Sequence, residues 1–236
     1  MPLRRWSRFI LEQTPVLLGN DIVDLQEASA TGKVQELRFL ERVFTVGEQE
    51  CIRAADCAVL MLWMLWSGKE SLFKVMSKIE SGLVFSHKRF ALEEKVLTAL
   101  LSGASSGGKI VSEILFENRS MHLQWEWNSE YVHCVASDTE PGTVFSRVDF
   151  LSAPREGSLS AREEESVHSP ESRKVRLLAK EILEERLFVQ NPEIVRERES
   201  SRFRSPQILE NGLPVPALDL SLSHDGRFVA AVVSIC

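Results

Sequence analysis

The 236-residue sequence lacks three features that would each indicate a particular class of protein: a cysteine framework, a long apolar run and an excess of basic residues. Its four cysteines form no C-x-x-C spacing, which argues against a zinc site, a redox pair or a disulfide scaffold and favours a reducing cytoplasm. The longest apolar run, residues 58–66, is less than half of the roughly 20 residues that a membrane span needs. We therefore expect a buried helix there and no membrane partner.

The charge balance is acidic, with 34 Asp and Glu against 28 Lys and Arg and a net charge of −6. A nucleic-acid-binding protein needs a basic surface to neutralise phosphates, so we expect no nucleic-acid partner. Arg4, Arg5 and Arg8 lie near the N-terminus, but Glu12 and Gln13 interrupt any apolar segment, and we expect no export signal. Ordinary contents of apolar (44%) and charged (26%) residues predict a globular protein.

Residues 152–172 have the composition of a linker, because they contain two prolines, six serines and a glutamate run but almost no large apolar side chain. This composition predicts a first unit over residues 1–151 and a second unit over residues 173–236. The total length, between one and two domains of about 150 residues, agrees with two small units that share one functional body.

The two predicted units contain similar elements, each with a long helix followed by a hairpin of alternating apolar side chains. The predicted helices span residues 56–78 and 173–188, and the predicted hairpins span residues 123–137 and 220–234. Asp225-Gly226 favours a type I′ turn in the second hairpin. We predict an α+β fold of two related units in a pseudo-twofold single-chain arrangement, each an antiparallel sheet packed on a long helix. A chance match of element types is the alternative.

Two acidic residues, Asp21 and Asp24, follow an apolar stretch at residues 16–18. A carboxylate at the end of a buried strand is well placed to hold Mg²⁺, which prefers oxygen ligands. The alternative is that one of the two caps the N-terminus of a helix.

Trp66, Glu70 and Lys74 recur at intervals of four residues, so we expect them on one face of the first long helix. An ordinary surface ion pair is one interpretation of this spacing. Because the helix is otherwise mostly apolar, the alternative is that these charges face a cleft or a partner.

Ser223 and His224 lie at the predicted tip of the second hairpin, where an imidazole, hydroxyls and turn amides could hold a phosphate. A solvated histidine is the alternative at such a tip.

Taken in order, these segments resemble the 4′-phosphopantetheinyl transferase superfamily, which includes the holo-acyl-carrier-protein synthases. The resemblance covers roughly residues 19–78 and 200–236. Four motifs carry it: G-x-D-I-V-[DE] at residues 19–24, R-F-x-x-R-x-[FL]-[TS]-x-x-E at 38–48, W-[ST]-x-K-E-[AS]-x-x-K at 66–74 and S-x-S-H-[DS] at 221–225. The motif order is that of the family's small, trimeric class, whereas two units in one chain are typical of its large class. The resemblance therefore implies a circularly permuted, monomeric pseudo-dimer rather than a trimer.

The resemblance implies an enzyme of the holo-acyl-carrier-protein synthase type, with Mg²⁺ held by Asp21 and Glu70 and with coenzyme A as the donor. Lys74 would contact the coenzyme A pyrophosphate, and Glu70 or a metal-bound water would take the proton of the attacking carrier-protein serine. His224 with Ser223 would hold a coenzyme A phosphate. Further candidates for the adenosine phosphates are Arg173, Arg176 and Lys180.

Three departures from the family pattern concern the ligands of the metal and of coenzyme A. The position two residues after Asp21 is Val23 rather than an acid, so two carboxylates would bind the metal. The loop at residues 76–83 has a single glycine where the family is glycine-rich, and the family's G-R-P appears as residues 204–206, Arg-Ser-Pro.

The implied partner is an apo acyl carrier protein or peptidyl carrier domain from fatty-acid, polyketide or peptide synthesis, with an acidic recognition helix. An acidic enzyme needs a local basic face to meet it. We expect that face at Lys33, Arg38 and Arg42, and the N-terminal arginines named above are the second candidate; a solvated surface run is the alternative for both sets. Two other functions stay open: a catalytically impaired relative that binds coenzyme A or a carrier protein as a regulator, and an unrelated α+β scaffold.

Overall fold

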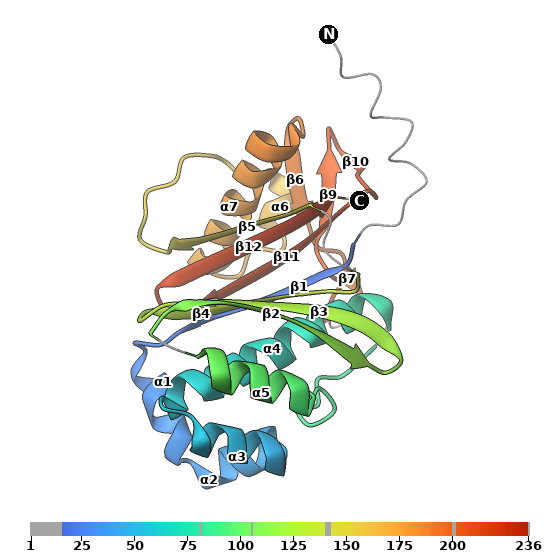
Figure 1. The fold of residues 1–236 in the computed structure, drawn as a ribbon. Helices are drawn as coiled ribbons and strands as arrows, with labels where there is room; N and C mark the ends of the chain where they lie inside the picture. The colour runs from blue at the N-terminus through green and yellow to red at the C-terminus, as the bar shows by residue number, and fades with distance from the viewer. Residues whose placement is uncertain (1–15, 81, 105, 140–142, 200–201, 236) are drawn as a thin grey trace.

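The computed structural model of the chain describes residues 16–80, 82–104, 106–139, 143–199 and 202–235 (Figure 1). The first half consists of β1 (Leu18–Asp24), α1 (Ala28–Gly32), α2 (Leu37–Val43), α3 (Val46–Ala54), α4 (Ala58–Ile79), α5 (Glu94–Gly103), β2 (Gly108–Phe116), β3 (Arg119–Trp127) and β4 (Tyr131–Ser137). The second half consists of β5 (Thr143–Phe150), α6 (Ala161–Glu164), α7 (Pro170–Leu187), β6 (Pro192–Val195), β7 (Arg198–Glu199), β8 (Arg202–Phe203), β9 (Gln207–Glu210), β10 (Leu213–Pro214), β11 (Leu218–Asp225) and β12 (Phe228–Ile235).

The strands form antiparallel sheets that lie between two groups of helices. A four-stranded sheet has the order β1-β4-β3-β2, and a three-stranded sheet has the order β11-β12-β5. The first sheet packs on α4 and the second on α7, with a separate apolar core under each helix. Figure 1 shows the helices of the first half at one end of the molecule and α6 and α7 at the other. The α+β class is thus confirmed, and the pseudo-twofold relation stays a prediction.

The two long helices and both hairpins occur where the sequence predicts them, with small shifts at their ends. The second helix begins at Pro170 instead of residue 173, because Ser169 caps its first turn and proline suits the first helical position. The turn of the second hairpin is also displaced. Asp225 still pairs with Phe228, so the central residues are Gly226 and Arg227, of which Gly226 alone has a positive φ, +48°.

The predicted linker is more structured than its composition suggests. Within residues 152–172 lie α6 and the first residues of α7, and Ser160 and Glu163 form a reciprocal capping box at the start of α6. Strand β5, which precedes the predicted boundary at residue 151, pairs with β12 of the second sheet. The boundary therefore separates β5 from its own sheet, and the division into two units stays a prediction.

Gly19 allows β1 to lie directly on α4. A Cβ atom at this position would come within 1.9 Å of the Ser71 carbonyl oxygen and 3.0 Å of the Lys74 Cβ atom. Any side chain would therefore push the strand off the helix. The close approach brings the middle of β1 to the part of α4 that carries Lys74.

The two sheets meet where β1 and β11 run side by side (Figure 1). Alternate side chains of β11 accept hydrogen bonds from alternate backbone N–H groups of β1, so side chains replace a backbone ladder at this edge. The four bonds run from Leu18 N to Asp219 Oδ2 (2.6 Å), Asn20 N to Ser221 Oγ (2.9 Å), Ile22 N to Ser223 Oγ (3.0 Å) and Asp24 N to Asp225 Oδ2 (2.8 Å). The polar residues around the S-L-S-H-D motif thus join the two halves of the molecule.

Candidate active site

Asp21 lies in the middle of β1, not at the end of a strand as the sequence suggested, because residues 18–24 all pair with β4. Its Oδ1 atom accepts hydrogen bonds from Lys74 Nζ (3.2 Å) and from Ser223 Oγ (3.1 Å). Burial raises the pKa of this carboxyl group, and the nearby Lys74 ammonium opposes the increase. The Oδ2 atom has no hydrogen-bond partner among the residues that the structure describes.

Glu70 is the second carboxylate of the site and lies half-buried on α4. Burial and the adjacent Asp21 raise its pKa to about 7, with Lys74 acting in the opposite direction. No described residue donates a hydrogen bond to its side chain. Glu70 can therefore change its protonation state near neutral pH, which is a property of general bases.

Lys74 connects the helix to the strand. Its Nζ atom donates to the Asn20 carbonyl oxygen (2.6 Å) as well as to Asp21. Trp66, Glu70 and Lys74 are all partly exposed, whereas the intervening Ser67 and Ser71 are buried. The predicted common face is thus confirmed.

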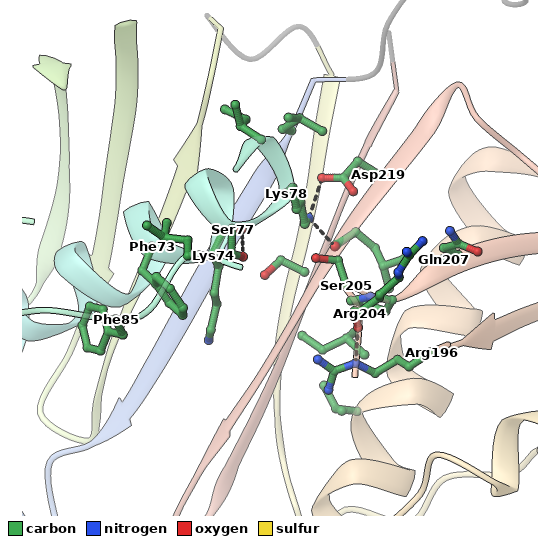
Figure 2. Close-up of a pocket in the computed structure, with 18 of the residues that line it drawn as sticks. Phe73, Lys74, Ser77, Lys78, Phe85, Arg196, Arg204, Ser205, Gln207 and Asp219 are labelled. Carbon is green, nitrogen blue, oxygen red and sulfur yellow. Dashed lines mark hydrogen bonds and ion pairs between the residues drawn. The ribbon is translucent and has the colours of Figure 1, made fainter. Parts of the chain in front are cut away.

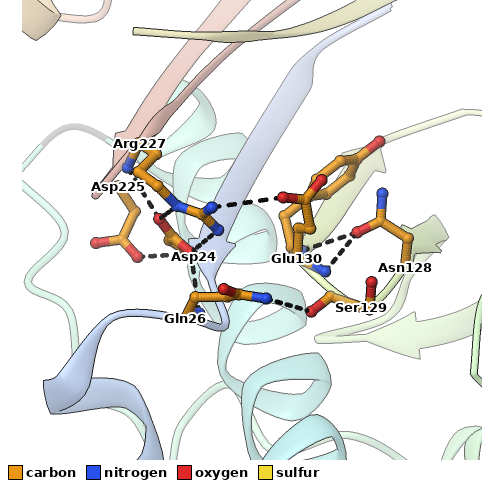
Figure 3. Close-up of polar contacts among 8 residues, drawn as sticks. Asp24, Gln26, Asn128, Ser129, Glu130, Asp225 and Arg227 are labelled. Carbon is orange, nitrogen blue, oxygen red and sulfur yellow. Dashed lines mark hydrogen bonds and ion pairs between the residues drawn. The ribbon is translucent and has the colours of Figure 1, made fainter. Parts of the chain in front are cut away.

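Asp24, the other candidate of the first motif, is a structural residue (Figure 3). It is fully buried and accepts two hydrogen bonds of 2.8 Å from the Arg227 guanidinium, one to each carboxylate oxygen. The backbone N–H groups of Arg227 and Gln26 complete its contacts. The N-cap of α1 is Glu27, so Asp24 does not cap this helix. Gly226 packs against it, since a Cβ there would lie 2.6 Å from Asp24 Oδ2.

We expect Asp24→Asn to lower the free energy of unfolding by about 2 kcal/mol at neutral pH, because the amide cannot accept on both sides of the guanidinium. Hydrogen bonds from Arg227 hold the Asp24 pKa below its usual value. The extra stability of wild type over Asp24→Asn is therefore present above about pH 4 and is lost as the pH falls through the lowered Asp24 pKa. Urea unfolding of both proteins at neutral and acid pH measures this difference. A difference in free energy of unfolding that stayed constant with pH would contradict the prediction.

A cleft of about 1130 Å³ opens beside Lys74, between α4 and the second half of the molecule (Figure 2). Lys74 and His224 line it, and so do Phe73 and Phe85, which Figure 2 shows on the α4 side. Across from them lie the arginines Arg176, Arg196 and Arg204. The cleft thus combines aromatic side chains with cationic ones, a combination that suits an amphipathic phosphate ester.

Of the three basic residues predicted on α7, only Arg176 lines this cleft. It is buried, and its guanidinium donates to Ser166 Oγ (2.9 Å) and to Ser172 Oγ (2.5 Å) while Nε has no partner. Burial, with Arg196 nearby, lowers its pKa. Arg173 instead forms an ion pair with Glu164, and Lys180 pairs with Glu163 at 3.0 Å.

Arg196 and Lys78 do not stand out in the sequence, whereas Arg204 belongs to the Arg-Ser-Pro segment at the family's G-R-P position. Lys78 Nζ donates to Asp219 Oδ2 (2.7 Å) and to the carbonyl oxygens of Leu18 and Leu220, so it fastens α4 to both β1 and β11 (Figure 2). The signal for Lys78 was its spacing of four residues from Lys74. Arg196 has no local signal, because the segment that follows β6 meets the cleft only after folding.

The departures from the family pattern differ in their consequences. Val23 is a buried apolar residue, so the position two residues after Asp21 supplies no third carboxylate. The single glycine of the loop, Gly82, has φ +83°, and residues 82–85 line the cleft. Residues 204–206, Arg-Ser-Pro, line the cleft as well.

The lysine of the W-S-G-K-E motif is structural. Lys69 Nζ donates to Glu48 Oε2 (2.7 Å), and both side chains are almost completely buried. Glu48 also forms a capping box with Thr45 and accepts the Leu92 N–H (3.0 Å). The second and third sequence motifs therefore meet in the core under α4.

The Asp21–Glu70 pair fits a hard divalent cation as a two-carboxylate site. Among the described residues, the Glu70 side chain and the Asp21 Oδ2 atom have no hydrogen-bond partner, and carboxylate oxygens are the ligands that Mg²⁺ prefers. Within the described part of the chain, no cluster of three or more His, Cys, Asp or Glu residues could hold a metal.

The predicted basic face lies on and beside α2. Arg38 and Arg42 are exposed, whereas Lys33 is half-buried, pairs with Glu36 and lies over the Phe39 ring. Arg4, Arg5 and Arg8 lie outside the described residues.

A family model of the 4′-phosphopantetheinyl transferase superfamily matches residues 17–136, just over half of the sequence. The match includes Asp21, Glu70 and Lys74 and ends before β5, and it excludes an unrelated scaffold with chance motifs. No curated protein matches the chain in sequence. In the described segments, every helix is too short or too polar to cross a membrane.

Proposed function

Since the chain belongs to the 4′-phosphopantetheinyl transferase superfamily, we propose that it transfers 4′-phosphopantetheine from coenzyme A to a serine of an apo carrier protein. The serine oxygen attacks the phosphorus that bears the pantetheine arm, and the P–O bond to the adenosine half breaks. The serine proton goes to a base in the site, and 3′,5′-ADP leaves. The observation that carries the proposal is the pair Asp21 and Glu70, beside Lys74 and at the edge of the arginine-lined cleft.

In this proposal Glu70, whose carboxylate accepts no hydrogen bond from the described residues, takes the serine proton. Lys74 contacts the pyrophosphate and stabilises the leaving 3′,5′-ADP. Mg²⁺, held by Asp21 and Glu70, would supply neutralisation of the charge that develops on the pyrophosphate oxygens.

The donor would lie in the cleft between the two halves. Arg176, Arg196 and Arg204 are proposed to face the phosphates of the adenosine half, together with His224 at the end of β11. The aromatic side chains of Phe73 and Phe85 would take the pantetheine arm. Arg173 and Lys180 are not part of this proposal, because neither lines the cleft.

The acceptor would be an apo acyl carrier protein or peptidyl carrier domain, in a reaction of the holo-acyl-carrier-protein synthase type. Its acidic helix would meet Arg38 and Arg42, which point the same way along α2 at a spacing of four residues. Helix α2 is close to the site, because its Phe39 stacks on Trp66 of α4 (5.8 Å between ring centroids). Trp66 lies one helical turn before Glu70. We further propose that the chain acts as a monomeric pseudo-dimer in the cytoplasm.

Release of 3′,5′-ADP from coenzyme A tests this function. Incubation with Mg²⁺ and a panel of apo carrier proteins is expected to release 3′,5′-ADP with at least one carrier. A carrier whose acceptor serine is replaced by alanine should release none. The rival function, a regulator that binds coenzyme A or carrier without transfer, would give binding by calorimetry but no 3′,5′-ADP with any carrier.

A further inference from the structure

Ser223 contacts Asp21 across the junction of the two halves, and it does not line the cleft as a phosphate-binding residue would. Ser223 is 5% exposed, and its hydroxyl has two short contacts: it accepts the Ile22 N–H (3.0 Å) and donates to Asp21 Oδ1 (3.1 Å). A serine hydroxyl has one proton, so donation to Asp21 leaves none for a ligand. This geometry differs from the sequence-based role, in which Ser223 holds a phosphate of coenzyme A.

We infer that Ser223 is a positioning residue that orients the Asp21 carboxylate for metal binding from the opposite half of the molecule. The inference rests on the proposed function, in which Asp21 is a metal ligand. Lys74 from α4 and Ser223 from β11 hold the same oxygen, Oδ1. Two anchors on one oxygen fix the plane of the carboxylate and leave Oδ2 available. The orientation of the metal ligand thus depends on correct packing of β11 against β1.

Ser221 provides a matched control on the same strand. Ser221 is 4% exposed, and its hydroxyl accepts the Asn20 N–H (2.9 Å), as the Ser223 hydroxyl accepts the Ile22 N–H. Among the described residues, it contacts no carboxylate. Ser221→Ala and Ser223→Ala each remove one edge contact of β1, and only the second also releases Asp21. A difference between the two variants therefore measures the positioning role.

The test is a titration of each protein with Mn²⁺, followed by electron paramagnetic resonance of free Mn²⁺, in the absence of substrate. We expect Ser223→Ala to weaken Mn²⁺ binding by about tenfold, the usual effect of removing a hydrogen bond behind a metal ligand. Ser221→Ala should bind as wild type does, and Ser223→Thr, which keeps the hydroxyl, should recover most of the affinity. Thermal unfolding is expected to shift alike for the two alanine variants. In the transfer reaction, Ser223→Ala should need more Mg²⁺ for half-maximal rate.

Equal Mn²⁺ affinity in the two alanine variants, with wild-type binding and transfer intact, would overturn the positioning role and leave the proposed function standing. Failure of Ser223→Thr to recover affinity would count against the hydroxyl as the responsible group. If the wild-type protein neither bound Mn²⁺ nor released 3′,5′-ADP, both the proposed function and the inference built on it would be wrong.

Discussion

Replacing Glu70 with glutamine is expected to lower kcat for phosphopantetheine transfer by about 10³-fold or more, because one substitution removes both the base and a metal ligand. The two carboxylates lie beside each other, and glutamine keeps the shape of the side chain while removing the charge. Initial rates of 3′,5′-ADP release at saturating coenzyme A and carrier measure the effect. A matched control is Glu50→Gln, which changes an exposed glutamate of α3 and should leave the rate unchanged.

Glu70→Gln should also stabilise the metal-free protein at alkaline pH. The folded state raises the Glu70 pKa from 4.5 to about 7, so it binds this proton more tightly than the unfolded chain does. The stability from this proton is complete below about pH 4.5 and is lost as the pH rises through about 7. In EDTA at about pH 8, Glu70→Gln should therefore exceed wild type in free energy of unfolding by about 2–3 kcal/mol. A variant that is inactive and less stable at that pH would instead indicate a folding defect.

Glu48→Ala is expected to cost about 3–5 kcal/mol of stability, the largest loss that we predict for a single substitution. It leaves the buried Lys69 ammonium without its counter-charge, with only the carbonyl oxygens of Val43 (3.4 Å) and His87 (3.0 Å) nearby. It also removes the capping box of α3 and the acceptor of the Leu92 N–H. Urea unfolding at neutral pH measures the change.

A double-mutant cycle separates the ion pair from the other contacts of Glu48. Lys69→Met combined with Glu48→Leu should recover a large part of the loss, because a well-packed apolar pair replaces two buried charges. Additive losses in the cycle would show that the capping contacts, and not the ion pair, stabilise this part of the core. Both Glu48→Ala and the double variant, when folded, should keep transfer activity, because Lys69 lies under the site and not in it.

Local patterns in the sequence were sufficient to predict the elements that carry the site. The spacing of Trp66, Glu70 and Lys74 predicts a shared helix face because helical periodicity is a local property. Both long helices and both hairpins follow from apolar periodicity in the same way. The capping box at Ser160 was also readable, but the serine- and glutamate-rich composition around it was interpreted as a linker.

Long-range contacts set the roles that the sequence could not assign. Residue chemistry alone does not separate Asp21 from Asp24, and the contact that gives Asp24 its structural role comes from Arg227, some 200 residues later. Ser223 lies in the motif beside His224, yet its partner is on β1. Arg196 reaches the cleft through the packing of β6 against α7. Pairing of β5 with β12 likewise depends on contacts about 80 residues apart, which no local pattern encodes.

The most direct test of the proposed function is the mass of an apo carrier protein after incubation with coenzyme A, Mg²⁺ and this protein. We predict that the carrier gains one phosphopantetheine group on its acceptor serine with the wild-type protein, and none with Glu70→Gln or in EDTA. Carriers that bind the folded, metal-loaded protein but keep their original mass across the whole panel would contradict the account.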